Sequence, residues 1–93
     1  MTIAIAGHHF DHASYDADGD VLYLRAGERQ AAARSHASPE GHALRYDQAG
    51  ELIGMTIVNA KWLLERDGEL TITIPEPTRV SADALAPALG TAA

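Results

Sequence analysis

The stretch DADGDV at residues 16–21 has a pattern that returns as DQAGEL at residues 47–52 and as ERDGEL at residues 65–70. Each copy reads acid, two variable residues, glycine, acid and aliphatic residue. The first acid can accept backbone N–H groups in a type I turn, and the glycine can adopt the positive φ that closes a three-residue hairpin loop. The starts at 16, 47 and 65 are unevenly spaced, which argues against a solenoid repeat. We therefore predict three β-hairpins.

The residues that flank these turns predict how the strands pair. A three-residue loop at the third copy pairs Leu64 with Leu70, Trp62 with Ile72 and Ala60 with Ile74 on an apolar face, and Leu63 with Thr71 and Lys61 with Thr73 on the other. This alternation is typical of an antiparallel ribbon that covers a core on one side. The same rule pairs Tyr15 with Val21 in the first hairpin, and Tyr46 with Leu52 and Ala43 with Met55 in the second.

The remaining chain supplies further strands. The run from Leu52 to Val58 is apolar on both faces, so we predict that it is the central strand. A strand over residues 2–6 is expected to turn back at Gly7 into a strand over residues 10–15. The segment 27–41, rich in alanine, serine and histidine, has no firm period, and it fits either a long loop or an edge strand around residues 32–36.

Prolines and a capping serine mark the C-terminal end. Pro75-Glu76-Pro77 cannot continue a ladder of hydrogen bonds, so the sheet is expected to end there. Ser81 can cap a short helix whose inner face holds Ala82, Leu85 and Leu89. We predict a mainly β, β-rich α+β fold, an antiparallel meander of about five to seven strands. Residues 1–80 form one domain, and residues 81–93 form a short C-terminal helix and a frayed tail.

Length and charge exclude several classes of protein. With 93 residues the chain is sized for one small core, which leaves little room for a deep active-site cleft. Thirteen acidic and seven basic side chains give a net charge of -6, which disfavours nucleic acid and anionic membranes and favours a basic partner. The chain has no cysteine, no signal-peptide pattern at its start and no apolar run long enough to span a bilayer. We expect a soluble cytoplasmic protein.

Three groups of residues could carry chemistry. His8, His9 and His12 are weak candidates for a metal site, although a strand would place the rings of His8 and His12 about 13 Å apart at roughly 3.3 Å per residue. The predicted pairs of turn acids, Asp16 with Asp20, Asp47 with Glu51 and Glu65 with Glu69, could each hold a cation, but capping of the turn by the first acid is the simpler interpretation. Asp16, Asp18 and Asp20 do not continue into an EF-hand, because Val21 and Gly27 occupy its required glycine and glutamate positions.

A third group has the residue types of a hydrolase: Ser35, His36, Ser38, Glu40 and His42. Their spacing matches no nucleophile motif, so we interpret them as a polar loop. Tyr15, Tyr23, Tyr46 and Trp62 are expected in the core. Asn59, at the end of the central strand, is expected to be a buried structural amide.

Part of the chain resembles a known family. Tyr15-Asp16 is followed by Asp20-Val21-Leu22-Tyr23-Leu24, and later by Tyr46-Asp47, Gly50, Ile53-Gly54-Met55-Thr56-Ile57 and Asn59-Ala60. This order is similar to the short bacterial proteins grouped as domain of unknown function 2283. The resemblance covers residues 15–60 and implies a small β-rich fold in a bacterial cytoplasm, with no established activity, cofactor or catalytic residue. Some members are encoded beside small toxin-like proteins, which implies an antitoxin-like role.

These observations predict a non-catalytic interaction or regulatory module, not an enzyme, and no cofactor. We expect a homodimer, because a single small sheet leaves its edges open. The motif residues Tyr15, Asp16, Asp20, Tyr23, Tyr46, Asp47, Gly50, Gly54 and Asn59 are interpreted as structural. The alternatives are a metal-binding protein or minor enzyme that uses the histidines or the turn acids, and a protein with a small-ligand pocket beside Tyr23 and Trp62.

Overall fold

The structure of the chain is a computed structural model that describes residues 3–5, 7–28, 30–73 and 78–90. These residues form β1 (Ile3–Ile5), β2 (His8–Phe10), β3 (His12–Asp16), β4 (Val21–Arg25), β5 (Arg34–Ala37), β6 (Ala43–Tyr46), β7 (Leu52–Val58), α1 (Ala60–Asp67), β8 (Glu69–Ile72), β9 (Thr78–Ser81) and α2 (Ala82–Leu89). The predicted β-rich class with a short C-terminal helix is confirmed.

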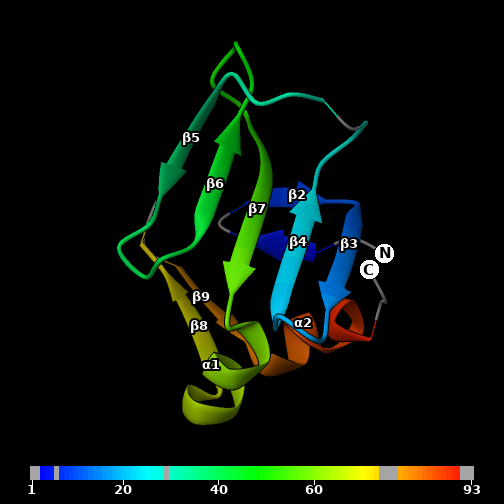
Figure 1. Cartoon of the computed structure of the whole chain (residues 1–93), viewed down its shortest axis with the longest axis vertical. Coiled ribbons are helices and arrows are strands. Elements are labelled where there is room, and N and C mark those ends of the chain that lie inside the picture. Colours follow the sequence, from blue (N-terminus) through cyan, green and yellow to red (C-terminus); the bar gives the residue numbers. More distant parts are fainter. Residues whose placement is uncertain (1–2, 6, 29, 74–77, 91–93) are drawn as a thin grey trace.

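The main sheet has five antiparallel strands in the order β3-β4-β7-β6-β5 (Figure 1). Strand β7 lies in the middle, which confirms the prediction for residues 52–58. Strand β5 settles the open question in segment 27–41, because Arg34–Ala37 is an edge strand paired with β6. Two separate hairpins, β1-β2 and β8-β9, complete the strands.

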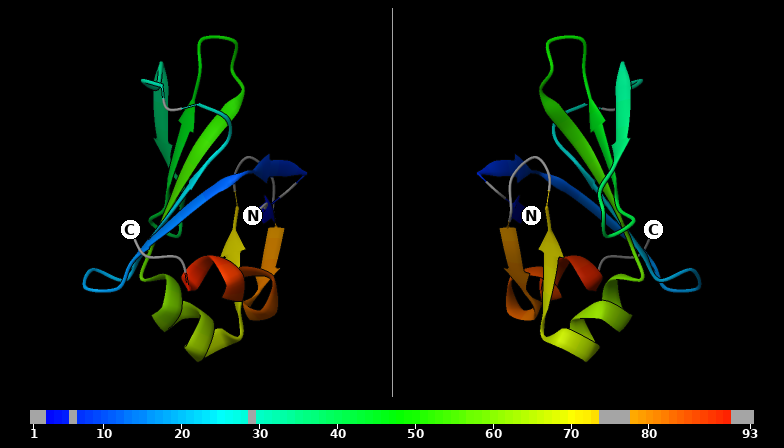
Figure 2. Two further views of the ribbon diagram at one scale, coloured as in Figure 1. Left: turned by 90° about the vertical axis from the view of Figure 1, so that its right-hand side faces the viewer. Right: turned by 90° about the vertical axis from the view of Figure 1, so that its left-hand side faces the viewer.

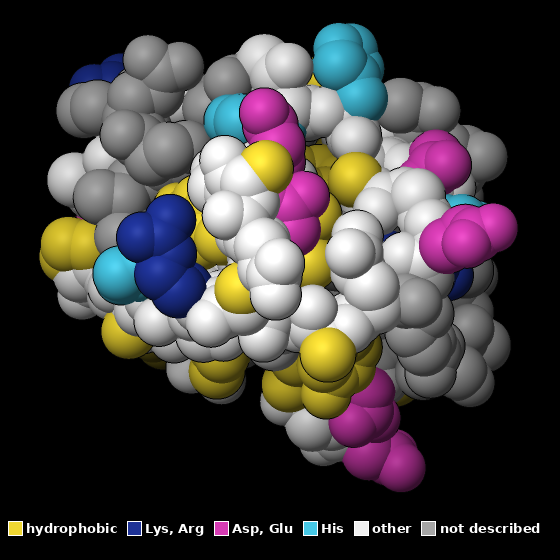
Figure 3. Space-filling view, turned by 90° about the horizontal axis from the view of Figure 1, so that it is seen from above, with side chains coloured by type: hydrophobic (Ala, Val, Ile, Leu, Met, Phe, Trp, Pro, Cys, Tyr) yellow, Lys and Arg dark blue, Asp and Glu magenta, His cyan; other side chains and the backbone are white. Residues whose placement is uncertain are grey.

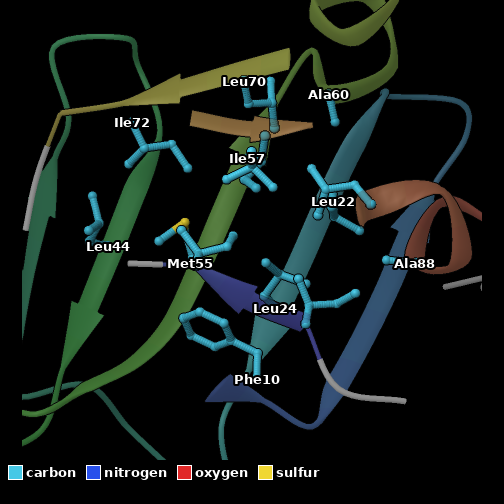
Figure 4. Close-up of a cluster of buried hydrophobic side chains, with 14 of the residues drawn as sticks. Phe10, Leu22, Leu24, Leu44, Met55, Ile57, Ala60, Leu70, Ile72 and Ala88 are labelled. Carbon is cyan, nitrogen blue, oxygen red and sulfur yellow. The ribbon is translucent and has the colours of Figure 1, made fainter. Parts of the chain in front are cut away.

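The two hairpins and α2 lie on one side of the five-stranded sheet (Figure 2). Between them and the sheet is a core of buried apolar side chains, which includes Phe10 from β2, Leu24 from β4, Ile57 from β7 and Ile72 from β8 (Figure 4). Figure 1 looks onto the opposite side of the sheet, where β4 and β7 have no element in front of them. We call these two sides the covered face and the open face.

The prediction of a third hairpin is wrong, because Ala60–Asp67 forms helix α1. Alanine, lysine, leucine, glutamate and arginine are strong helix formers, and Ala60 and Leu64 are buried one helical turn apart. Gly68 has the expected positive φ of 76°, but it ends the helix, and its N–H donates to the Leu64 carbonyl at 2.8 Å. Trp62 is 55% exposed, so its expected place in the core is also wrong.

The predicted end of the sheet needs correction as well. Residues 74–77, which include Pro75-Glu76-Pro77 and the expected partner Ile74, lie outside the described residues. Beyond them, β9 pairs with β8, so pairing of strands resumes after the prolines. The C-terminal helix is confirmed: the Ala84 N–H donates to Ser81 Oγ at 3.2 Å, and Leu85 is fully buried. The expected fraying at residues 91–93 lies outside the described residues.

The register of the first hairpin differs from the prediction by one residue. Tyr15 pairs with Leu22, and Asp16 pairs with Val21. The loop is one residue longer than expected, because Asp20, not Gly19, takes the positive φ of 56°.

In the second hairpin the predicted pair of Tyr46 and Leu52 is confirmed, and Gly50 has a φ of 84°. A register shift between Arg45 and Tyr46 then places Ala43 opposite Thr56 in place of the predicted Met55.

The first strands follow the predicted course with one interruption. Strand β1 turns back at Gly7, whose φ is 80°, and pairs with β2. The chain leaves that hairpin after Phe10 and enters the main sheet at His12. Thr2 and Ala6, the ends of the predicted first strand, lie outside the described residues. Among the described residues, no helix is both long and apolar enough to span a membrane.

Candidate functional site

Asp20 connects the first hairpin to the start of α1. Its Oδ1 accepts hydrogen bonds from the Tyr15 hydroxyl at 2.7 Å and the Lys61 N–H at 2.8 Å, and its Oδ2 accepts from the Trp62 N–H at 3.1 Å. The Asp20 carbonyl accepts from the Ala60 N–H at 3.1 Å. Asp20 therefore caps a helix that begins about forty residues later in the chain.

This network shifts two ionisation equilibria. Partial burial opposes ionisation of Asp20, but the hydrogen bonds from Tyr15 and from the backbone of Lys61 and Trp62 outweigh it and lower the pKa of the carboxyl group. The hydrogen bond to Asp20, followed by burial and nearby negative charge, raises the pKa of Tyr15 to about 12. Both shifts favour a charged Asp20 and a neutral Tyr15, as a structural cap requires.

Asn59 contributes through its backbone. It is exposed, not buried as predicted, and its side chain makes no cap hydrogen bond. Its φ of 58° and ψ of 39° are left-handed, a conformation that asparagine tolerates better than most residues. This conformation turns the chain from the end of β7 into α1.

The other turn acids cap their own loops. Asp16 Oδ1 accepts the Asp18 N–H at 3.1 Å, and Asp47 Oδ1 accepts the N–H groups of Ala49 and Glu51, both at 2.9 Å. These bonds confirm the capping role expected of the first acid in two of the three turns.

The second acid of the first turn behaves differently, because Asp20 turns toward α1. The predicted facing pairs of acids are wrong at two turns, since Asp16 faces Val21 and Glu65 lies within α1.

The predicted histidine cluster is divided between two sheets. His8 pairs with Ile5 in the hairpin β1-β2, whereas His12 pairs with Arg25 in the main sheet. His12 Nε2 lies 3.8 Å from Asp11 Oδ1. Within the described ranges, no group of three or more histidine, aspartate or glutamate side chains is placed to hold a metal ion.

The hydrolase-like residues also separate. His36 is on the exposed edge strand β5 and meets the Tyr46 ring edge-on at 5.5 Å. Ser38 Oγ accepts the His42 backbone N–H at 3.1 Å, and Glu40 accepts hydrogen bonds from the Thr73 N–H and hydroxyl. The contacts of Ser38 and Glu40 fasten a loop to its neighbours, in agreement with the polar-loop interpretation. That interpretation is wrong for Ser35 and His36, because both lie in strand β5.

His42 is buried, which the sequence reasoning did not foresee. Its Nδ1 accepts the Val58 N–H at 3.1 Å, so Nε2 carries the proton of the neutral ring, and this atom has no partner among the described residues. Burial lowers the pKa of His42, against the charge of Glu40. His42 borders a hollow of about 300 Å³ between the β6 end of the sheet, α1 and β8.

Another hollow, of about 520 Å³, lies on the open face over β3, β4, β6 and β7. We call it the arginine hollow. Its polar lining is His12, Ser14, Tyr23, Arg25, Arg45 and Thr56. Tyr23 is 44% exposed, so its expected place in the core is wrong, whereas Tyr15 and Tyr46 do pack against the core.

Sequence reasoning missed His12, Arg25 and Arg45 as members of one site. A signal was present, since Tyr23 and Arg25 are two residues apart on a strand and therefore share a face. The position of Arg45 beside them depends on strand order, which a single sequence does not show. The acidic average also concealed it, because a net charge of -6 does not show where the basic side chains lie. From above, Figure 3 shows acidic side chains at several separate places on that surface.

The motif residues thus occupy four places. Tyr15, Asp20 and Asn59 join the first hairpin to α1. Asp16, Asp47 and Gly50 shape turns, and Tyr46 packs against the core. Tyr23 and Gly54 lie at the open face, where Tyr23 lines the arginine hollow. The interpretation of all nine as structural stays a prediction.

Comparison with known proteins identifies the family. A search of curated proteins and a search of solved structures gave no match. The family model described as "Protein of unknown function (DUF2283)" matches residues 12–61, which are 50 of the 93 residues. The matched segment contains every residue that lines the arginine hollow. The chain belongs to the DUF2283 family.

Proposed function

We propose that this protein is a non-catalytic interaction module that binds a protein partner on its open face. The observation that carries the proposal is the contrast between the two faces of one sheet: hairpins and a helix cover one, and the other is bare over its central strands (Figures 1 and 2). The bare side also contains the arginine hollow. A cytoplasmic setting fits this role.

The side chains of the open face suit a protein contact. Tyr23 is 44% exposed and Val58 is 38% exposed, on the neighbouring strands β4 and β7. Trp62, in the helix that follows β7, is also exposed, with the Arg66 guanidinium 4.6 Å from its ring centroid. Tyrosine, tryptophan and arginine are the residues that most often dominate the energy of protein interfaces.

The charge of the molecule is unevenly distributed along β4. Arg25, at the C-terminal end of β4, which is the upper end in Figure 1, lines the arginine hollow. At the lower end, negative charges of Asp16, Asp20 and Glu65 all act on Tyr15. A partner that presents basic groups to this lower, acidic end agrees with the basic partner expected from the net charge.

An antitoxin-like role is the specific form of this proposal that the family resemblance suggests. A small basic toxin-like protein encoded next to this chain would be the first partner to test. Binding of that protein would support the role. If the protein encoded next to this chain neither binds it nor loses its toxicity in its presence, the role is contradicted.

We also propose a homodimer formed along strand β5. All four of its residues are exposed, and β5 is an edge of the sheet. An edge strand can pair with a second copy and so extend the sheet. Sedimentation equilibrium should give twice the chain mass, and Ser35→Pro should restore the monomer because proline removes an N–H from the edge. A monomer at all protein concentrations would overturn this assignment.

Crosslinking from defined positions tests the binding face. A photoreactive amino acid at position 23 or 56 should capture the same partner in cells where the gene is native, and one at position 83, on the exposed side of α2, should not. With the purified pair, Tyr23→Ala should weaken binding about tenfold or more, and Asp83→Ala should leave it unchanged. Equal capture from all three positions, or full affinity of Tyr23→Ala, would contradict the proposal.

A further inference from the structure

The arginine hollow gathers positive charge on an acidic protein. Its lining contains two arginines and one histidine, together with Ser14, Tyr23 and Thr56, and no carboxylate. Ion pairs among the described residues join other arginines to acids, namely Arg66 to Asp67 and Arg79 to Glu69. Among the described residues, neither Arg25 nor Arg45 lies within ion-pair distance of a carboxylate. The Asp11 carboxylate, 3.8 Å from His12 Nε2, acts on Arg25 only at longer range.

Gly54 brings the two arginines to one place. It pairs with Arg25 of β4 on one side and with Arg45 of β6 on the other, so all three residues share the open face. A Cβ at position 54 would lie 3.3 Å from the Leu24 carbonyl oxygen and 3.8 Å from Cβ and Cδ of Arg45. The missing side chain therefore lets Arg45 lie close against β7 and leaves space between the two arginines.

The loop after β4 holds both guanidinium groups. Arg25 Nη1 donates to the Gly27 carbonyl at 2.6 Å, and Arg45 Nη2 donates to the Gln30 carbonyl at 3.2 Å. The loop itself is fastened, because the Gly27 N–H donates to Asp11 Oδ1 at 2.9 Å. Each of these bonds uses one of the five N–H donors of a guanidinium, so donors remain for a ligand.

We infer that the arginine hollow binds an oxyanion, a carboxylate or phosphoryl group, on a side chain of the protein partner. The inference rests on the proposed function and adds the chemistry of the contact. Arginine forks match the planar oxygens of carboxylate and phosphate groups, and positioned donors lose less entropy on binding. Tyr23 at the rim can pack against the carbon atoms that carry the charged group.

Titration of the ¹⁵N-labelled protein, followed by NMR, tests this site. The probes are a short peptide with one glutamate, the same peptide with phosphoserine or with glutamine at that position, and inorganic phosphate. The glutamate or phosphoserine peptide should shift the amides of Arg25, Arg45 and Thr56, and the glutamine peptide should not. Which of the two binds more tightly distinguishes a carboxylate from a phosphoryl ligand.

Charge-neutral variants supply the matched control. Arg25→Gln and Arg45→Gln should each weaken binding of the charged peptide about tenfold, whereas Arg79→Gln changes the net charge equally at β9 and should have no effect. Equal weakening by all three variants would overturn the inference, since it would show general attraction. Binding of inorganic phosphate alone, with neither charged peptide, would overturn it too.

The two proposals fail in different experiments. A partner captured at positions 23 and 56 that binds Arg25→Gln and Arg45→Gln as tightly as the unchanged protein would overturn the oxyanion inference and support the interaction module. Loss of that capture, with peptide binding at the hollow intact, would overturn the interaction module and leave a site for charged side chains.

Discussion

Strands β4 and β7 carry a different surface on each face of the same sheet. Leu22, Leu24, Met55 and Ile57 point into the core. Tyr23 lies between the first two in sequence and Thr56 between the last two, and both border the open face. Because successive residues of a strand point to opposite sides, one short segment serves both purposes. The comparison teaches that stability and binding can be changed separately here, by substitution of alternate residues.

The largest expected loss of stability comes from a substitution on the covered face. Ile57 is fully buried, so Ile57→Ala should lower the free energy of unfolding by about 2–5 kcal/mol through lost burial and a cavity. Thr56→Ala, one residue away on the open face, should cost at most about 1 kcal/mol. Urea unfolding of both variants measures the difference. Similar losses would mean that the open face is itself packed against something.

A smaller effect is expected where a polar group holds the backbone. Asp20→Ala removes the cap of α1 and the acceptor of Tyr15, and should cost roughly 2 kcal/mol. Asp18→Ala removes the same charge in the same turn and should stay within about 0.5 kcal/mol. Thermal unfolding compares them, with helix content followed by circular dichroism. Equal stability of the two variants would show that Asp20 does not stabilise α1 as its cap.

The smallest expected effect is on the pH dependence of stability, to which a buried and an exposed histidine should contribute differently. Burial lowers the pKa of His42 in the folded state, so the unfolded chain takes up its proton at higher pH. The stability that neutral His42 contributes is therefore complete above about pH 6.5 and declines as pH falls through the folded pKa.

Urea unfolding at pH 7.5, 6.5 and 5.5 measures that decline. It should be smaller in His42→Gln than in the unchanged protein, and His12→Gln, altered at the exposed histidine of the open face, should keep the full decline. Identical slopes in all three proteins would show that His42 is not the group responsible.

Local sequence patterns predicted the structure correctly where they were compatible with only one conformation of the chain. The turns at Asp16 and Asp47, the central strand Leu52–Val58 and the cap at Ser81 were all found from adjacent residues. The segment 60–67 failed because its apolar residues fit both a strand and a helix. Ala60 and Leu64 share a face in either, and Gly68 takes a positive φ in either.

Candidate site residues were predictable to a smaller extent. Tyr23 and Gly54 were singled out by the resemblance, but Arg25 and Arg45 were not, because they are 20 residues apart and meet across β7. The burial of His42 was equally invisible, since its cover comes from α1 and β8, which follow later in the chain.

The sequence by itself determined the β-rich class, the two hairpin turns and the family, because these depend on neighbouring residues and on a motif in fixed order. The tertiary structure alone decided which face of the sheet is covered, that Asp20 caps a distant helix and that two arginines flank Gly54. Those features depend on strand order and on long-range packing. Such contacts join residues far apart in the chain, where local periodicity carries no information.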